Sequence, residues 1–254
     1  MTKKIKTLFK LIKTVKNYPI YILDFLGFKN GKVITYKLYN GLRYQVRGGT
    51  TDRFIINEIW LHKTYTPYGF EIKENDIVID VGAHIGIFTI FAAHCAKNGK
   101  IYAFEPVKEN FQLMKKNLSL NRKKNVFAFN RAVSNSEGNV NLYVSKERNR
   151  GQNSFIKLAD NYETRIVDKM NFKKIIKTLP RVDFLKMDCE GAEYDILFSL
   201  SKNEMKKIKK ISMEYHNYAL RNGEEIARFL KDNNFNVWIK RGKIFGTIYA
   251  KLDE

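Results

Sequence analysis

Ile77-Val-Ile-Asp-Val-Gly-Ala-His-Ile-Gly-Ile-Phe-Thr89 is the stretch of this 254-residue chain that decides its fold. It predicts a short apolar strand ending on an acid, then a glycine-rich turn and an apolar helix. This order builds a nucleotide-type ligand site at the carboxyl end of a parallel strand. Gly82 and Gly86 lack a Cβ, so the turn can approach a ligand closely. Asp80 is expected to orient the turn or the amino acid end of the ligand.

A second strand strengthens this interpretation. Ile101-Tyr-Ala-Phe-Glu-Pro106 predicts a strand that ends on Glu105, 25 residues beyond Asp80. An acid at the tip of the next strand is where such folds bind ribose hydroxyls. Pro106 biases Glu105 toward extended backbone, which leaves the carboxylate at the crevice. We therefore predict that Glu105 accepts hydrogen bonds from both hydroxyls of a ribose.

The spacing of the turn distinguishes between nucleotide cofactors. The dinucleotide fingerprint G-x-G-x-x-G needs a glycine where this chain has His84, so close approach of a pyrophosphate is obstructed. S-adenosylmethionine carries no phosphate, and a looser turn suffices for it. The sequence thus favours S-adenosylmethionine over NAD. Because a helix N-terminus disfavours an imidazolium, His84 is expected to be a neutral hydrogen-bonding spacer rather than a catalyst.

Three motifs, in this order, resemble those of FkbM-type methyltransferases. They are Asp80–Thr89, Phe104-Glu-Pro106 and Phe184-Leu-Lys-Met-Asp-Cys-Glu-Gly-Ala-Glu193, flanked by Arg47-Gly-Gly-Thr-Thr-Asp52 and Ser212-Met-Glu-Tyr-His216. The similarity spans residues 40–216. It implies a class I methyltransferase fold that uses S-adenosylmethionine and commonly methylates hydroxyls of sugars or secondary metabolites. It also implies that Asp52 closes over the cofactor and that the position of His216 is functional.

Three carboxylates follow the strand predicted at residues 183–188. Asp188, Glu190 and Glu193 lie within six residues and could bind the amino group of the donor, a metal ion or the acceptor hydroxyl. A hard cation such as Mg²⁺ would take one or two of them plus waters; we assign no metal ligand. Acids are also favoured at a helix start, which is the alternative for Glu190 and Glu193.

Glu214 and His216 are two residues apart on a predicted strand, so both point to one face. A hydroxyl acceptor needs a base near the transition state. His216 is the natural choice, since an unperturbed histidine titrates near neutral pH. The alternative is that His216 is a structural histidine at a strand end, where a neighbouring group satisfies its hydrogen-bonding capacity.

These arguments define the predicted site. The cofactor-binding set is Asp52, Asp80, Gly82, Ala83, His84, Gly86, Glu105, Pro106 and Asp188. The predicted catalytic residues are His216 and Asp188, and the substrate contacts are Glu190, Glu193, Glu214 and Ser154. Ser154 belongs to the polar segment 145–163, which is expected to be a functional lid or a mobile surface loop.

Composition and patterning place the chain among globular α/β proteins. Apolar content of 44% and charged content of 28% are ordinary, and the length suffices for a sizeable core. We expect an α/β, Rossmann-like, doubly wound and mostly parallel sheet closed by an antiparallel terminal hairpin at residues 236–240 and 243–251. Residues 1–62 are expected to form an amino-terminal extension of helices and a strand pair, and residues 63–254 the methyltransferase domain.

The cysteine and charge patterns bear on location and partners. Two cysteines give no disulfide framework, which suits a reducing, cytoplasmic compartment. Of the 46 basic residues behind the net charge of +20, 34 are lysine. Nucleic-acid interfaces often use arginine for bidentate base recognition, so a lysine-rich solvated surface is the favoured interpretation. Residues 1–16 predict a basic amphipathic helix that either packs on its own domain or contacts the inner membrane surface peripherally.

Three other functions remain as alternatives. A basic surface with a pI of about 9.7 permits an RNA or DNA methyltransferase. Against it, Asp188-Cys-Glu-Gly191 stands where many base-amino methyltransferases carry Asn/Asp-Pro-Pro-Tyr/Phe. The broken glycine spacing disfavours an NAD-dependent oxidoreductase. The third alternative is a binding module that has a cofactor-binding fold but no catalytic activity.

Overall fold

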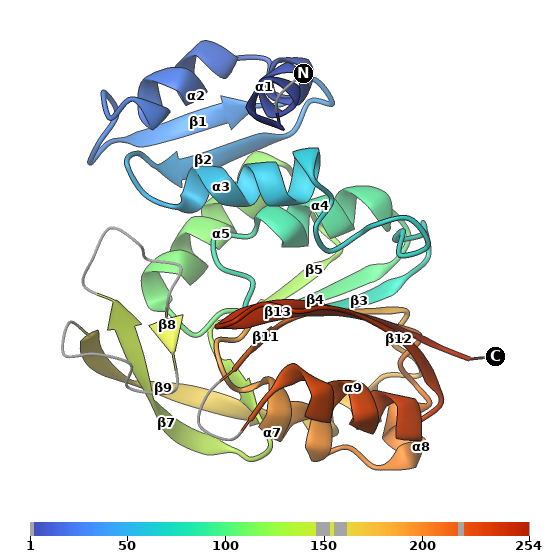
Figure 1. Cartoon of the computed structure of the whole chain (residues 1–254). Coiled ribbons are helices and arrows are strands. Elements are labelled where there is room, and N and C mark those ends of the chain that lie inside the picture. The colour runs from blue at the N-terminus through green and yellow to red at the C-terminus, as the bar shows by residue number, and fades with distance from the viewer. Residues whose placement is uncertain (1–2, 146–152, 155–161, 218–220, 254) are drawn as a thin grey trace.

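A seven-stranded sheet forms the centre of the computed structural model, which describes residues 3–145, 153–154, 162–217 and 221–253 (Figure 1). The strand order is β12-β13-β11-β10-β3-β4-β5, and β13 alone runs antiparallel to its neighbours. The strands are β3 (Ile77–Val81), β4 (Lys100–Phe104), β5 (Val126–Phe129), β10 (Phe184–Met187), β11 (Lys210–His216), β12 (Phe235–Lys240) and β13 (Phe245–Leu252). The doubly wound sheet with an antiparallel strand from a terminal hairpin is therefore confirmed.

Helices cover both faces of this sheet (Figure 1). One face carries α4 (Ile87–Cys95) and α5 (Lys108–Leu120), and the other carries α6 (Phe172–Thr178), α7 (Glu193–Phe198), α8 (Lys202–Met205) and α9 (Gly223–Asp232). The apolar helix expected after the glycine turn begins at Ile87, because Gly86 takes a left-handed conformation (φ +84°) at its N-cap. At the start of α9, Asn222 and Glu225 form a capping box.

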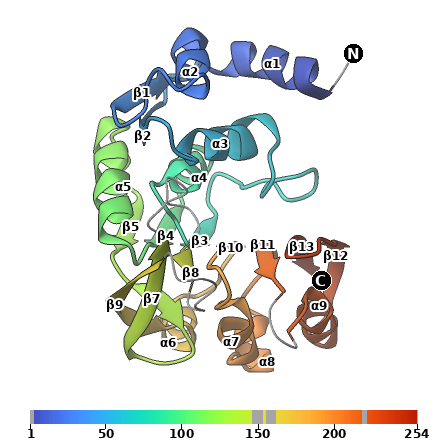
Figure 2. The same cartoon turned by 60° about the vertical axis from the view of Figure 1, so that its left-hand side comes forward.

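The predicted amino-terminal extension packs on the α4–α5 face (Figure 2). It consists of α1 (Lys3–Thr14), α2 (Tyr18–Phe25), β1 (Val33–Lys37), β2 (Arg43–Arg47), α3 (Asp52–Ile56) and the π-helical turn η1 (Asn57–Leu61). Buried Leu11 of α1 and Val15 just after it belong to the same apolar core as α4. The side chains of Asn117 and Asn121 on α5 accept hydrogen bonds from the backbone of β2 at 2.7 and 2.8 Å. Since these contacts join it to α5, the extension is tied to the core by polar bonds as well as by apolar packing.

A second sheet, which the sequence analysis did not predict, lies beside the carboxyl ends of the central strands. Its order is β6-β9-β7-β8, with β6 (Ala132–Ser134), β7 (Gly138–Ser145), β8 (Asn153–Ser154) and β9 (Tyr162–Asn171). The signal was present, since Leu142 and Val144 are buried and alternate with polar or half-exposed neighbours. Of the segment 145–163, expected to be irregular, residues 146–152 and 155–161 lie outside the described part of the chain.

Gly82, directly after β3, lies close against the turn that follows β10. Its φ is +77°, a left-handed conformation, and a Cβ there would overlap the backbone carbonyl of Asp188 after β10. The backbone of Asp188 in turn donates to the carbonyl of Val81 at 3.0 Å. Only glycine meets both the conformational and the steric requirement.

We expect Gly82→Ala to lower the free energy of unfolding by at least about 3 kcal/mol, because left-handed strain adds to a backbone clash. The matched control is Gly41→Ala, which has the same sign of φ (+87°) but no atom within 4 Å of the added Cβ. The control should lose only about 1 kcal/mol. Equal losses in urea unfolding would show that the close approach to Asp188 is not the constraint.

Candidate active site

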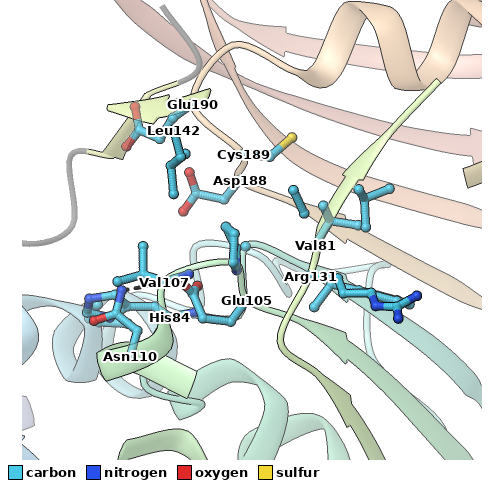
Figure 3. Close-up of a pocket in the computed structure, with 16 residues that line it drawn as sticks. Val81, His84, Glu105, Val107, Asn110, Arg131, Leu142, Asp188, Cys189 and Glu190 are labelled. Carbon is cyan, nitrogen blue, oxygen red and sulfur yellow. Dashed lines mark hydrogen bonds between the residues drawn. The ribbon is translucent and has the colours of Figure 1, made fainter. Parts of the chain in front are cut away.

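A pocket with about 640 Å³ of empty space, open to solvent, lies at the carboxyl ends of β3, β4 and β10. Ligands bind at this position in doubly wound sheets because the chain reverses its winding direction there. Figure 3 shows Asp188 and Glu190 on one side of the pocket and Glu105 and His84 on the other. The lining residues are Ile55, Val81, Gly82, His84, Phe104, Glu105, Pro106, Val107, Asn110, Arg131, Ala132, Val133, Leu142, Asp188, Cys189 and Glu190.

Glu105 stands at the tip of β4 with its carboxylate in this pocket. The backbone N–H groups of His84 and Val107 donate to it at 2.7 and 2.9 Å, and Asn110 Nδ2 donates at 3.3 Å. These bonds fix the carboxylate: Oε1 accepts from both Val107 and Asn110, whereas Oε2 accepts only from His84 and keeps a lone pair for a further donor. Burial raises the pKa of Glu105 to about 7, so the group titrates near neutrality.

Arg47 of β2 connects the amino-terminal extension to the glycine turn. Its guanidinium donates to both carboxylate oxygens of Asp52 at 2.9 Å, and Nη1 donates to Asn110 Oδ1 at 2.8 Å. Nη2 also lies 3.1 Å from His84 Nε2. Burial by itself would raise the pKa of Asp52, but His84 and Arg47 hold it below its usual value. Since Asn110 contacts Glu105, a residue of the extension positions the predicted ribose-binding carboxylate.

His84 is neutral in this environment. Burial lowers its pKa to about 4, in line with the expected neutral state. Its Nδ1 is buried and has no hydrogen-bond partner among the described residues. Since a buried polar atom without a partner costs free energy, a ligand in the pocket is a ready partner for it.

Lys186 is a buried lysine in the middle of β10, only 3% exposed. Its ammonium lies 3.3 Å from Asp80 Oδ1 and 3.9 Å from Asp188 Oδ2, and it donates to the Gly82 carbonyl at 2.7 Å. Burial alone would lower the pKa of Lys186, but Asp80 and Asp188 raise it, so the lysine stays charged. The Tyr65 hydroxyl holds Asp188 Oδ2 from another direction at 2.9 Å. Lys186 thus clamps the turns after β3 and β10 together.

His216, at the end of β11, is surrounded by three glutamates. Its Nε2 lies 3.0 Å from Glu190 and 3.4 Å from Glu214, and its Nδ1 lies 3.0 Å from Glu193. Burial by itself would lower the pKa of His216, but these hydrogen bonds raise it far above its usual value. The near-neutral pKa expected for His216 is therefore corrected, because the imidazole is held as a cation that has no free position to accept a proton.

Glu190 is the member of this cluster that reaches the pocket. Burial raises its pKa to about 7, against the lowering influence of His216. Its backbone is left-handed (φ +52°), as is that of His84 (φ +51°) on the opposite wall. Such conformations cost non-glycine residues free energy and collect at functional sites. The two strained residues face the same cavity.

The structure brings together part of the predicted site. The predicted residues that line the pocket are Gly82, His84, Glu105, Pro106, Asp188 and Glu190. Seven predicted residues do not line the pocket and can act on a ligand only through other residues. They are Asp52, Asp80, Ala83, Gly86, Glu193, Glu214 and His216. Buried Asp80 accepts from the Thr89 hydroxyl at 2.6 Å, which agrees with a role in orienting the turn. Ser154 lies in β8, where its backbone pairs with Tyr143, but its side chain is outside what the structure describes.

Four residues with clear structural roles in the site were missed from the sequence: Arg47, Tyr65, Asn110 and Lys186. Lys186 could have been found, because a lysine inside the apolar run of β10 needs a buried counter-charge. Asn110 and Tyr65 carry no comparable local signal, since polar residues on a helix or loop are usually solvated.

The strand order and the pocket at the ends of β3, β4 and β10 define a class I methyltransferase fold. Residues 80–237, more than half of the chain, match the Methyltransferase FkbM domain. The chain therefore belongs to the FkbM methyltransferase family, as its three motifs predict.

Two curated relatives are similar to this chain over most of their own length. "Methyltransferase 1" of Beauveria bassiana is 27% identical over 181 residues, covering 63% of this chain and 72% of the relative. The 31-O-demethyl-FK506 methyltransferase FkbM of Streptomyces tacrolimicus is 24% identical, covering 84% and 93%. Among solved structures, TYW2 of M. jannaschii in complex with AdoMet is 16% identical with a TM-score of 0.49, covering 88% of this chain and 86% of the other.

We expect Lys186→Met to lower the free energy of unfolding by about 3–5 kcal/mol, because it leaves Asp80 buried without its counter-charge. Lys174→Met is the matched control, since it breaks an ion pair with Glu137 whose side chains are both more than half exposed. Chemical denaturation should show a loss below about 1 kcal/mol for the control. A Lys186→Met protein as stable as the control would contradict the clamp.

Proposed function

We propose that the chain binds S-adenosylmethionine in this pocket and transfers its methyl group to a hydroxyl of a glycan, a lipid-linked sugar or a secondary metabolite. The observation that carries the proposal is the position of Glu105, whose carboxylate enters the pocket beside the Gly82 turn. A carboxylate at the second strand tip suits the two vicinal hydroxyls of a ribose.

The residues present fit this cofactor on three counts. His84 Nδ1 is a buried polar atom that a ligand can satisfy. Asp188 presents a carboxylate, about one third exposed, that can bind a cationic amino group. Val81, Phe104, Val107 and Leu142 supply apolar walls for a purine. The bound cofactor would supply an electrophilic methyl group on a sulfonium.

A hydroxyl acceptor is supported by the carboxylates next to the pocket. When the new O–CH₃ bond forms and the S–CH₃ bond breaks, the hydroxyl proton must leave for a base. Glu190 lines the pocket and has a pKa near 7, which suits a base at neutral pH. His216 then acts as a positioning residue, because its charge and hydrogen bond hold Glu190 in place. The name of the Streptomyces tacrolimicus relative, 24% identical, also describes an O-methyl transfer.

The first test is calorimetric titration with S-adenosylmethionine, S-adenosylhomocysteine and NADH. We expect micromolar affinity for the first two and none for NADH. Glu105→Ala should weaken S-adenosylmethionine binding at least about 100-fold, because hydrogen bonding to a charged carboxylate in the pocket is lost. The affinity of Glu105→Asp should lie between those of the wild type and Glu105→Ala. Glu74→Ala, which changes an exposed glutamate, should bind as tightly as the wild type. Binding of NADH alone, or full affinity in folded Glu105→Ala, would refute the proposed cofactor site.

The assignment of the base is tested by pH–rate profiles of methyl transfer at saturating donor, using an acceptor found by screening glycans and lipid-linked sugars. Below pH 7 Glu190 becomes protonated, so we expect the wild-type kcat to fall toward acid pH. Glu190→Gln should lower kcat about 100-fold and abolish this acid limb.

His216→Gln discriminates between the two candidate bases. His216 lowers the pKa of Glu190, so removing it should shift the acid limb to higher pH without abolishing it. If His216 were the base, His216→Gln would abolish the limb and Glu190→Gln would retain it. Calorimetry on both variants should show S-adenosylmethionine affinity close to that of the wild type, which separates proton transfer from donor binding.

A further inference from the structure

The positive charge of the chain is concentrated in its amino-terminal extension. Residues 1–51 contain eleven lysines and arginines and one acid, Asp24, so they carry +10 of the net +20. Asp24 is buried, and its carboxylate accepts hydrogen bonds from the Tyr36 hydroxyl and the Gly49 backbone. No carboxylate of this segment therefore reaches the surface to neutralise the lysines.

Large apolar side chains are exposed on the same extension. Of fifteen exposed large hydrophobic residues among those described, nine fall within residues 8–54, which is too many for even scatter over the surface. They are Leu8, Phe9, Leu23, Phe25, Leu26, Phe28, Val33, Tyr39 and Phe54. Exposed apolar side chains gathered in one region mark an interaction surface.

Packing against the rest of the molecule buries only some of the apolar side chains of α1. Leu11 and Val15 are buried against the core, whereas Leu8 and Phe9 remain 45% and 54% exposed. At about 100° per residue, Leu8 lies roughly 60° from Leu11 and continues the buried stripe, whereas Phe9 lies roughly 160° from Leu11 and points away from it. Figures 1 and 2 show α1 and α2 on the outside of the molecule, beyond β2 and α3. The two interpretations of the basic helix are thus compatible, since one part of the stripe packs and another faces out.

The turn from α2 into β1 adds a second set of exposed apolar groups. Leu26 and Phe28 are 59% and 69% exposed, and Val33 at the start of β1 is 65% exposed. Lys29 and Lys32 lie between them in the chain. Aromatic and leucine side chains interspersed with lysines are the composition of interfacial membrane anchors.

The positive charge and the exposed apolar side chains of the amino-terminal extension together favour one kind of binding partner. A nucleic acid would match the charge but leave the phenylalanines in water, and a second copy would bring two surfaces of like charge together. An anionic bilayer accepts both, because lysines meet its headgroups while apolar side chains enter the interface. None of the described helices is long and apolar enough to cross a membrane. We propose that α1, α2 and the turn to Val33 form a peripheral docking surface for an anionic lipid bilayer.

Vesicle sedimentation of the full chain tests this surface. We expect binding to phosphatidylcholine vesicles containing phosphatidylglycerol and none to phosphatidylcholine alone. Phe9→Ser/Phe28→Ser should lower the partition constant at least about tenfold through lost apolar burial. Lys13→Gln/Lys16→Gln should lower it about 25-fold, since each lysine near the surface contributes about fivefold.

Matched controls remove the same chemistry elsewhere. Ile166→Ser/Ile244→Ser removes two exposed apolar groups outside the extension, and Lys202→Gln/Lys206→Gln removes two lysines at α8, on the opposite side of the molecule from α1 (Figure 1). Both controls should bind vesicles as the wild type does. Because all substituted groups are exposed or at the surface, thermal midpoints should be unchanged. If the phenylalanine variant fails to fold, the lysine pair and its control decide the question.

Four outcomes would overturn the proposal. The first is that the chain does not bind anionic vesicles. The second is that the control variants lose as much vesicle binding as the test variants, which would mean that the net charge of the whole chain attracts the vesicles diffusely. The third is a concentration-dependent dimer in sedimentation velocity that Phe9→Ser/Phe28→Ser abolishes, since the apolar surface would then belong to a second copy. The fourth is binding of an RNA oligonucleotide with the same loss in the phenylalanine variant and no binding to vesicles.

Discussion

The buried ammonium of Lys186 is the interaction on which the site depends. It lies between Asp80 and Asp188 and donates to the carbonyl of Gly82, so it joins the turns after two neighbouring strands. A buried charge is tolerated only with partners, and the requirement is mutual because Asp80 is also fully buried. The missing Cβ of Gly82 permits the close approach that this pairing needs. The ligand pocket is the space that remains beyond this clamp.

Electrostatics divide the pocket into two functional sides. On one side, Glu105 is held by backbone N–H groups and by Asn110, which Arg47 of the extension positions. On the other, His216 is a cation among carboxylates, and Glu190 extends from this cluster into the pocket. Burial brings the pKa of both glutamates to about 7, so both sides of the site respond to pH in the neutral range. In the proposed function, donor binding and proton transfer belong to separate carboxylates.

The amino-terminal extension serves the site and the surface at once. Its inner side delivers Arg47 to the glycine turn and shares an apolar core with α4. Its outer side carries lysines together with exposed Phe9 and Phe28. A segment that packs through one part of its apolar stripe and exposes another part can connect a surface contact to the position of the pocket.

Local patterns in the sequence determined the fold class and the first half of the site. The strand–turn–helix at residues 77–89 and the acid at Glu105 could be predicted because strand, turn and helix preferences act between residues close in the chain. The second sheet was missed, although Leu142 and Val144 alternate with polar or half-exposed neighbours, because that alternation covers only a few residues. The charge of His216 and the identity of the groups that pair with Lys186 were decided by tertiary structure. A pKa depends on groups a few ångströms away, and here those groups come from turns and strands far apart in the sequence.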